Sequence, residues 1–192
     1  MSILGAINEI ENTIENDVIK KREEYKNYID EHIELVKKAF RIFESIDWKD
    51  GHMKETLRYV RDAIEVHDES KYSDAEFEYY RKNFFPINDK EKEDNKEDFD
   101  IAWNHHYRFN FHHPEYWIDS NGNPSPMCLS AIIEMICDWQ AMSFKYGEDC
   151  RSWYYSIKDT EEDKVLADET REKLEQLLDI YVVHGLNKQV EL

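Results

Sequence analysis

The sequence predicts an all-α protein. Glycine and proline, which interrupt helices, contribute only five and four of its 192 residues. Apolar residues recur at spacings of three and four rather than in strict alternation, which indicates helices rather than strands. Because 41% of the residues are hydrophobic and 14% aromatic, the chain can bury a core. We therefore expect one helical bundle of about six to seven helices, including a long N-terminal helix.

Glycine, proline and loop-forming residues mark where the predicted helices begin and end. Residues 3–46 contain no proline and predict one long helix, or two joined helices. Ser73 followed by Glu76 has the spacing of a capping box, which predicts a short helix ending near residue 83. The stretch 88–98 has no apolar residue and is expected to be a solvated loop or the exposed start of a helix. Further helices are expected at 53–67, 99–109, 127–146 and 160–183, with a loop at 119–126.

The net charge limits the kinds of partner that we expect, and the cysteines indicate the redox state of the compartment. A net charge of -18 repels nucleic-acid backbones and anionic lipids, so we expect neither nucleic acid nor a membrane as a partner. This argument does not apply to a small phosphorylated molecule, because a bound divalent metal reverses the local field. Three cysteines without CxxC spacing indicate a reducing compartment. With no apolar segment typical of a signal peptide or a membrane span, we expect a cytoplasmic protein.

Three predicted helices each direct a polar residue towards the core. His32 shares an apolar face with Ile29 and Val36. Asp138 shares one with Met135 and Met142. His67 continues the apolar face of the second helix, and Asp68 follows it directly. A single inward histidine is more often a satisfied core residue, and Asp68 alone is explained by pairing with a lysine three residues on. Their coincidence on three helices favours a metal site, since a buried aspartate needs a compensating cation.

Four of the eight histidines lie close together between the second helix and Asp138. Imidazole and carboxylate groups together suit divalent transition metals such as Mn, Co, Ni, Fe or Zn, so we expect one or two such ions. The alternative is a histidine-rich surface loop, but five aromatic residues interleave with these histidines and indicate burial. The four histidines are His105, His106, His112 and His113.

The order of His32, His67-Asp68, the later histidines and Asp138 resembles the HD-domain superfamily of metal-dependent phosphohydrolases, over about residues 25–146. The spacings are similar to those of small bacterial HD-domain 5′-nucleotidases. The string from His67 to Lys71 is similar to the HDxGK motif of cyclic-dinucleotide phosphodiesterases in this superfamily. Ser70 replaces the glycine of that motif and no GYP follows, so cyclic-dinucleotide cleavage is not expected. The fuller pattern (HDxSK, AWxHHxxxNxHHPEYW, EMICDW) resembles a family of small bacterial and phage proteins without an assigned activity.

The resemblance implies a site and a reaction. His32, His67, Asp68 and Asp138 would bind a first metal ion, and Asp68 would bridge to a second. The second ion would be held by His106 and His113 or by His105 and His112, between which the sequence does not choose. The implied activity is metal-assisted hydrolysis of a small phosphoester, such as a nucleotide. In this single domain, residues 1–24 would form a helical extension, 25–146 the metal-binding core and 147–192 the C-terminal helix.

Other residues have candidate roles in that reaction. Asp68, Lys71 and Glu115 are the candidate catalytic residues, with Lys71 holding a phosphate oxygen or, alternatively, pairing with a neighbouring acid. Glu115 and Glu134 are candidates for proton transfer, or for anchoring a ligand histidine.

Two further functions fit the sequence. Some HD-fold proteins carry a di-iron centre on four histidines and two aspartates and act as oxygenases, and this chain can supply that set. A non-enzymatic acidic decoy for a nucleic-acid-binding partner would fit the charge but leaves the inward histidines unexplained. The isoleucines at positions 3, 7, 10 and 14 have helical spacing, which fits either intramolecular docking or a homodimer.

Overall fold

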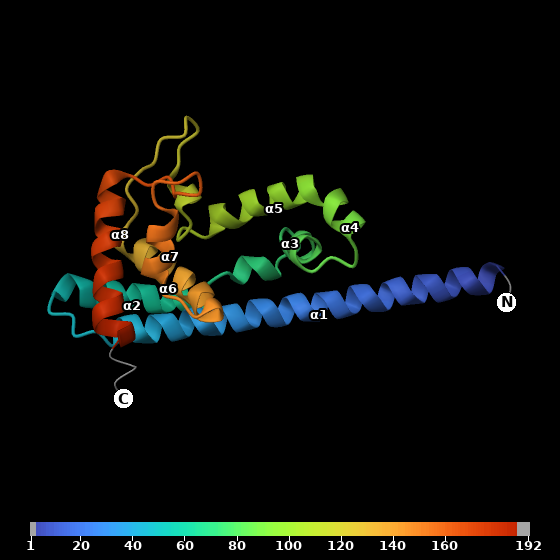
Figure 1. The fold of residues 1–192 in the computed structure, drawn as a ribbon, viewed down its shortest axis with the longest axis horizontal. Helices are drawn as coiled ribbons and strands as arrows, with labels where there is room; N and C mark the ends of the chain where they lie inside the picture. The colour runs from blue at the N-terminus through green and yellow to red at the C-terminus, as the bar shows by residue number, and fades with distance from the viewer. Residues whose placement is uncertain (1–2, 188–192) are drawn as a thin grey trace. The chain divides into compact units, whose positions relative to one another are not determined.

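The computed structural model describes residues 3–187 of the chain, with side chains described from Asn12 onward. This part of the chain is all-helical, and it contains no strand apart from an isolated bridge between Ile118 and Pro124. The prediction of an all-α fold with a long N-terminal helix is thereby confirmed (Figure 1). The helices are α1 (Ile3–Glu44), α2 (Gly51–Glu65), α3 (Phe77–Phe84), α4 (Asp89–Asp94), α5 (Lys96–Phe109), α6 (Leu129–Tyr146), α7 (Cys150–Ile157) and α8 (Asp168–Tyr181).

The described chain also contains two short 3-10 helices and one short π-helix. They are η1 (Glu69–Tyr72), η2 (Pro114–Trp117) and the π-helical η3 (Val182–Leu186). No helix in the described part of the chain combines the length and the apolar character that a membrane span requires. Of the four isoleucines with helical spacing near the N-terminus, the side chains of the first three lie outside the described ones, and Ile14 is exposed.

The predicted start of α3 at Ser73 is wrong. The helix begins at Phe77, and the Glu76 side chain makes no capping hydrogen bond to the backbone. Ser73 instead accepts the backbone N–H groups of Glu76 and Phe77 through its carbonyl, which forms a turn ahead of the helix. The capping-box pattern failed because the Glu76 carboxylate has buried partners elsewhere in the fold, which a local pattern does not reveal.

The prediction of one final helix over 160–183 is also wrong in its first part. A separate helix, α7, forms over Cys150–Ile157, before residue 160, and Asp149 caps it by accepting the Ser152 backbone N–H at 2.9 Å. A turn follows, in which Thr160 Oγ1 donates to the Ile157 carbonyl at 2.6 Å, and α8 then begins at Asp168. The acidic stretch after Pro86 contains α4, whose N-terminus is capped by the Asn88 side chain.

The described chain divides into two compact units. The first comprises the chain up to Glu31 together with Glu69–Phe109, and the second comprises His32–Asp68 together with the chain from Asn110 onward. α1 therefore contributes its N-terminal part to the first unit and its C-terminal part to the second.

The first unit is built around a buried arginine. Arg81 is 1% exposed, and its guanidinium group donates to both carboxylate oxygens of Glu91 at 2.9 and 2.7 Å. Such a two-point ion pair satisfies a charge that would otherwise be expensive to bury. Tyr25 packs its ring against those of Phe77 and Phe85, which adds an aromatic contact between α1 and α3 in this unit.

The second unit is built around α6. This helix is buried along most of its length, and α2, α7 and α8 pack against it. The C-terminal part of α1 is fixed in the same unit, because the Tyr181 hydroxyl donates to the Ala39 carbonyl at 3.1 Å and the Tyr181 ring stacks on Phe43. α6 thus offers a rigid support on which polar side chains can be held in fixed positions.

Candidate metal centre

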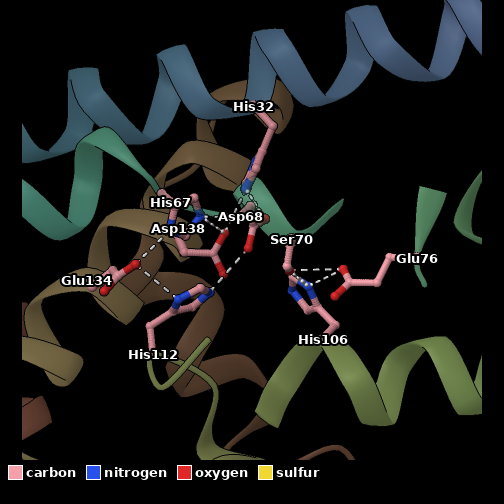
Figure 2. A network of polar contacts seen from close by, with 9 residues as sticks. All are labelled: His32, His67, Asp68, Ser70, Glu76, His106, His112, Glu134 and Asp138. Atoms are coloured by element: carbon pink, nitrogen blue, oxygen red, sulfur yellow. Dashed lines mark hydrogen bonds and ion pairs between the residues drawn. The ribbon is translucent and has the colours of Figure 1, made fainter. Parts of the chain in front are cut away.

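Polar side chains from four segments of the second unit meet around one carboxylate, that of Asp68. They come from α1, from the end of α2, from the loop after α5 and from α6 (Figure 2). These side chains form three overlapping groups, and within each group the potential ligand atoms lie within 4.8 Å of one another. The residues in these groups are His32, His67, Asp68, His112, His113 and Glu134.

The backbone at Asp68 explains how two successive residues reach one site. On a regular helix His67 and Asp68 would point in directions about 100° apart. Asp68 instead has a φ of 57°, in the left-handed region, and lies three residues after the last residue of α2. Aspartate tolerates this conformation better than most residues, and its use at a buried position is typical of functional sites. As a result His67 Nε2 lies 3.6 Å from Asp68 Oδ2.

The two aspartates lie between the histidines. His32 Nε2 is 3.0 Å from Asp138 Oδ1 and 3.6 Å from Asp68 Oδ2. His67 Nε2 is 3.9 Å from Asp138 Oδ1, and His112 Nε2 is 3.7 Å from Asp68 Oδ1. Nε2 atoms of three histidines and oxygens of two carboxylates therefore line a common space (Figure 2).

Glu134 fixes two of these histidines from behind. Its Oε1 atom accepts hydrogen bonds from His67 Nδ1 at 2.9 Å and from His112 Nδ1 at 3.1 Å. An ionised carboxylate only accepts, so each imidazole carries its proton on Nδ1 and presents the Nε2 lone pair to Asp68. A carboxylate behind the ring is the usual support of a histidine that binds a metal. Glu134, one turn before Asp138 on α6, thus orients two histidines that could bind a metal.

The pKa values of the two α6 carboxylates agree with that arrangement. Burial alone would raise the pKa of Glu134, but hydrogen bonds from His112 and His67 lower it to about 2. Burial would also raise the pKa of Asp138, yet the hydrogen bond from His32 and the nearby His67 and His112 rings hold it well below its usual range. Both groups are therefore negatively charged at neutral pH.

The residues present fit a divalent transition metal. His67 Nε2 and His112 Nε2 are buried and have no hydrogen-bond partner in the described part of the chain. A buried nitrogen lone pair without a donor costs free energy, and a metal ion removes that cost. Among the described residues, Glu134 and Asp138 form ion pairs with histidines rather than with lysine or arginine. A cation would balance these buried charges, and imidazole nitrogen with carboxylate oxygen suits the transition metals.

The structure places the four histidines of His105–His113 in two units. His112 and His113 belong to the second unit with the metal centre, and their rings lie 4.2 Å apart. His105 and His106 belong to the first unit. There His105 Nδ1 and His106 Nδ1 lie 2.7 and 2.8 Å from the two oxygens of Glu76.

Glu76 is the centre of this second polar cluster. Its side chain is fully buried, and one of its oxygens also accepts the Ser70 hydroxyl at 3.1 Å. Burial would raise the pKa of Glu76, but the hydrogen bonds and charges of His106, His105 and Ser70 lower it (Figure 2). We refer to Ser70, Glu76, His105 and His106 as the Glu76 cluster.

The remaining candidate catalytic residues are Lys71 and Glu115. Lys71 lies in η1 of the first unit, where its Nζ atom is 5.9 Å from the centre of the Tyr80 ring. Glu115 lies in η2 of the second unit, and its Oε2 atom is buried without a hydrogen-bond partner among the described residues. Their roles in catalysis stay predictions.

The sequence offered two alternative roles for Glu134, proton transfer or anchoring a ligand histidine, and gave Glu76 no role in a site. Helical phase placed Asp138 on an inward face, and Glu134 lies four residues earlier on the same face of α6. That spacing could have identified Glu134 as an anchor from the sequence. Glu76 gave a misleading local signal, since its spacing from Ser73 is that of a capping box.

A model of one protein family matches the chain over residues 21–180. It is described as a family of unknown function, DUF5662. The match includes every ligand candidate from His32 to Asp138. No curated protein and no solved structure matches the chain.

Proposed function

Because the chain belongs to DUF5662, a family of unknown function, we propose a function from the geometry of its metal centre. It is a metal-dependent phosphohydrolase that acts on a small phosphoester such as a nucleotide. The observation that carries this proposal is the arrangement around Glu134. Two histidines held through Nδ1 present buried, unpartnered Nε2 atoms to Asp68.

The proposed ligands are His32, His67, Asp68 and Asp138, joined by His112 and His113. A divalent transition metal held by them would supply Lewis acidity, polarising a phosphoryl group and lowering the pKa of a coordinated water. The order of these residues along the chain supports the resemblance to the HD-domain superfamily, because the residues that carry it lie in one cluster.

The side chains of the site have roles of their own in this proposal. Asp68 and Asp138 bring negative charge that selects a cation, and Glu134 prevents the two imidazole rings from turning away. Asp138 is partly exposed, with a side chain 17% accessible, whereas His67 and Asp68 are buried. Solvent and substrate therefore approach the cluster from the side of Asp138.

The experiment that tests this function is a hydrolysis panel. The protein is freed of metal, loaded with Mn, Co, Ni, Zn or Mg, and supplied with nucleoside monophosphates and simple phosphoesters. We expect phosphate release from at least one substrate with at least one metal. Asp68→Ala should abolish it, whereas His52→Ala, at an exposed histidine of α2, should not. Metal-loaded wild-type protein that releases no phosphate from any substrate would contradict the proposal.

One observation favours a second candidate function, that of a di-iron oxygenase. The second unit gathers four histidines and two aspartates, the set associated with HD-fold oxygenases. Protein purified with iron, and an absorbance band that changes on reduction, would support this candidate. The two functions separate cleanly, since the oxygenase consumes O2 and the hydrolase does not.

A further inference from the structure

A pocket of about 400 Å³ lies in the second unit, at the C-terminal end of α6. Its volume is in the range of small-molecule sites. Its lining residues come from α6, from α7 and from the turn between them. These two helices pack against each other (Figure 1). None of the ligands of the proposed metal centre lines it. The lining residues are Trp139, Met142, Ser143, Tyr146, Glu148 and Trp153.

Three aromatic rings dominate this lining. The rings of Trp139 and Trp153 have centres 4.9 Å apart and planes at 66°, so they form a corner rather than a slot. Trp139 is held in place from behind, because its ring stacks on Tyr154 at 13°. Tyr146 is 75% exposed, which is unusual for a large ring on a mostly buried helix. A planar ligand sandwiched by rings would need parallel faces, whereas a rounded group fits a corner.

The lining of the pocket carries negative charge, and the basic residue in the last turn of α6, Lys145, is not part of that lining. Glu148 is the only lining residue with a formal charge. The carbonyl groups of the last turn of α6 lie at the negative end of the helix dipole, where Gly147 ends the helix. Ser143 Oγ donates to the Trp139 carbonyl, which leaves its oxygen as an acceptor. Arg151, the basic residue of α7, is paired with Asp179 at 3.2 Å.

We propose that this pocket binds an organic cation, in particular a quaternary ammonium group. The faces of tryptophan and tyrosine rings attract cations, and a corner of such rings with one carboxylate is the arrangement that recognises trimethylammonium groups. The net charge of -18 raises the local concentration of cations further. The inference does not rest on the metal centre, since it uses different residues and concerns binding rather than turnover.

The test uses choline and its neutral isostere, 3,3-dimethylbutan-1-ol, which has the same shape without the charge. Calorimetric titration of the full-length protein should show choline binding at least about tenfold more tightly than the isostere. Asp68→Ala should bind choline as the wild type does, because the metal centre is not involved. Equal affinity for the two ligands, or no choline binding, would overturn the proposal.

Surface variants keep the test independent of folding. Tyr146 and Glu148 are exposed, so Tyr146→Ala and Glu148→Gln should leave the melting temperature unchanged. Tyr146→Ala should weaken choline binding by about two- to fivefold, the size of a partly exposed cation–π contact. Glu148→Gln should weaken it by a similar factor of about two to five, the size of an exposed ion pair. Tyr155→Ala is the matched control, because this exposed tyrosine of α7 does not line the pocket. An equal loss in Tyr155→Ala would overturn the assignment to this pocket.

Two other occupants are distinguished by the same samples. Adenosine binding that Tyr146→Ala abolishes, with no binding of choline, would show an aromatic-ligand site instead. A dimer that Tyr146→Ala dissociates and choline does not would show that a second copy of the chain covers the pocket. Either result would overturn the proposal of a cation site.

Discussion

The molecule contains two clusters in which a buried glutamate accepts hydrogen bonds from two histidines, one in each compact unit. Glu134 uses one oxygen for both His67 and His112, which come from separate segments of the chain. Glu76 uses one oxygen for each of His105 and His106, which are consecutive on α5. The motif of glutamate and two histidines is therefore shared, whereas the way the rings converge is not.

The difference lies in what the far side of the rings meets. On the side of the His67 and His112 rings away from Glu134, both Nε2 atoms approach the Asp68 carboxylate. Potential ligand atoms there form groups whose members lie within 4.8 Å of one another. In the Glu76 cluster the rings of Tyr80 and Trp103 contact the His106 ring. The Ser70 hydroxyl lies on the near side of that ring, beside the Nδ1 atom that bonds Glu76. A carboxylate beyond the rings favours a cation, whereas a hydroxyl and aromatic rings fit a core network. We refer to the residues of the candidate metal centre as the Glu134 cluster: His32, His67, Asp68, His112, His113, Glu134 and Asp138. We infer that the Glu134 cluster binds metal and that the Glu76 cluster stabilises its unit.

The largest expected effect comes from removing the carboxylate on which the ligand set converges. Asp68→Ala should lower metal affinity by at least about a hundredfold, because it deletes a ligand that two of the three overlapping groups share. Competition with a chromophoric chelator measures this affinity. His52→Ala, the matched exposed control, should retain wild-type affinity.

A smaller effect is expected from the anchor. Glu134→Gln should lower metal affinity by about 10- to 100-fold, since the amide supports the two Nδ1–H groups less well than a carboxylate. The same chelator competition measures it. Circular dichroism should show unchanged helix content, which separates this loss from unfolding. Unchanged affinity would show that Glu134 does not position the ligands.

The corresponding change in the other cluster should affect stability rather than metal. Glu76→Gln should reduce the free energy of unfolding by about 1–3 kcal/mol, because a buried acceptor of three hydrogen bonds is weakened. Urea denaturation measures that loss. Metal affinity should stay within about twofold of the wild type. A loss of metal as large as that of Glu134→Gln would break the distinction between the clusters.

The smallest effect is a change in acid sensitivity. The hydrogen bonds from Arg81 lower the pKa of Glu91, so this pair stabilises the fold above the unfolded-state pKa of about 4.5. That contribution is lost as the pH falls through the lower folded-state pKa. Glu91→Gln should therefore show a shallower decline in stability below pH 4.5 than the wild type. Denaturation at several pH values measures the slopes, and equal slopes would contradict this origin.

Local patterns predicted much of the fold and part of the site. The scarcity of glycine and proline and the helical spacing of apolar residues predicted the all-α class. The positions of His32, His67 and Asp138 on apolar helix faces predicted their inward direction, because burial follows the period of the helix. The convergence of these side chains was not predictable in detail. The left-handed backbone at Asp68 and the joint contact of His67 and His112 with Glu134 depend on tertiary packing. The division of the four later histidines between two units depends on it too, since adjacent positions looked equivalent.

The central claim is that the Glu134 cluster, and not the Glu76 cluster, holds a transition metal. The most direct measurement is elemental analysis of untagged wild-type, Asp68→Ala and Glu76→Gln proteins after loading with metal and removal of the excess. We expect about one or two metal ions per chain in the wild type and the same number in Glu76→Gln. We expect no metal in Asp68→Ala. Wild-type protein that cannot be loaded, or equal metal in all three proteins, would contradict it.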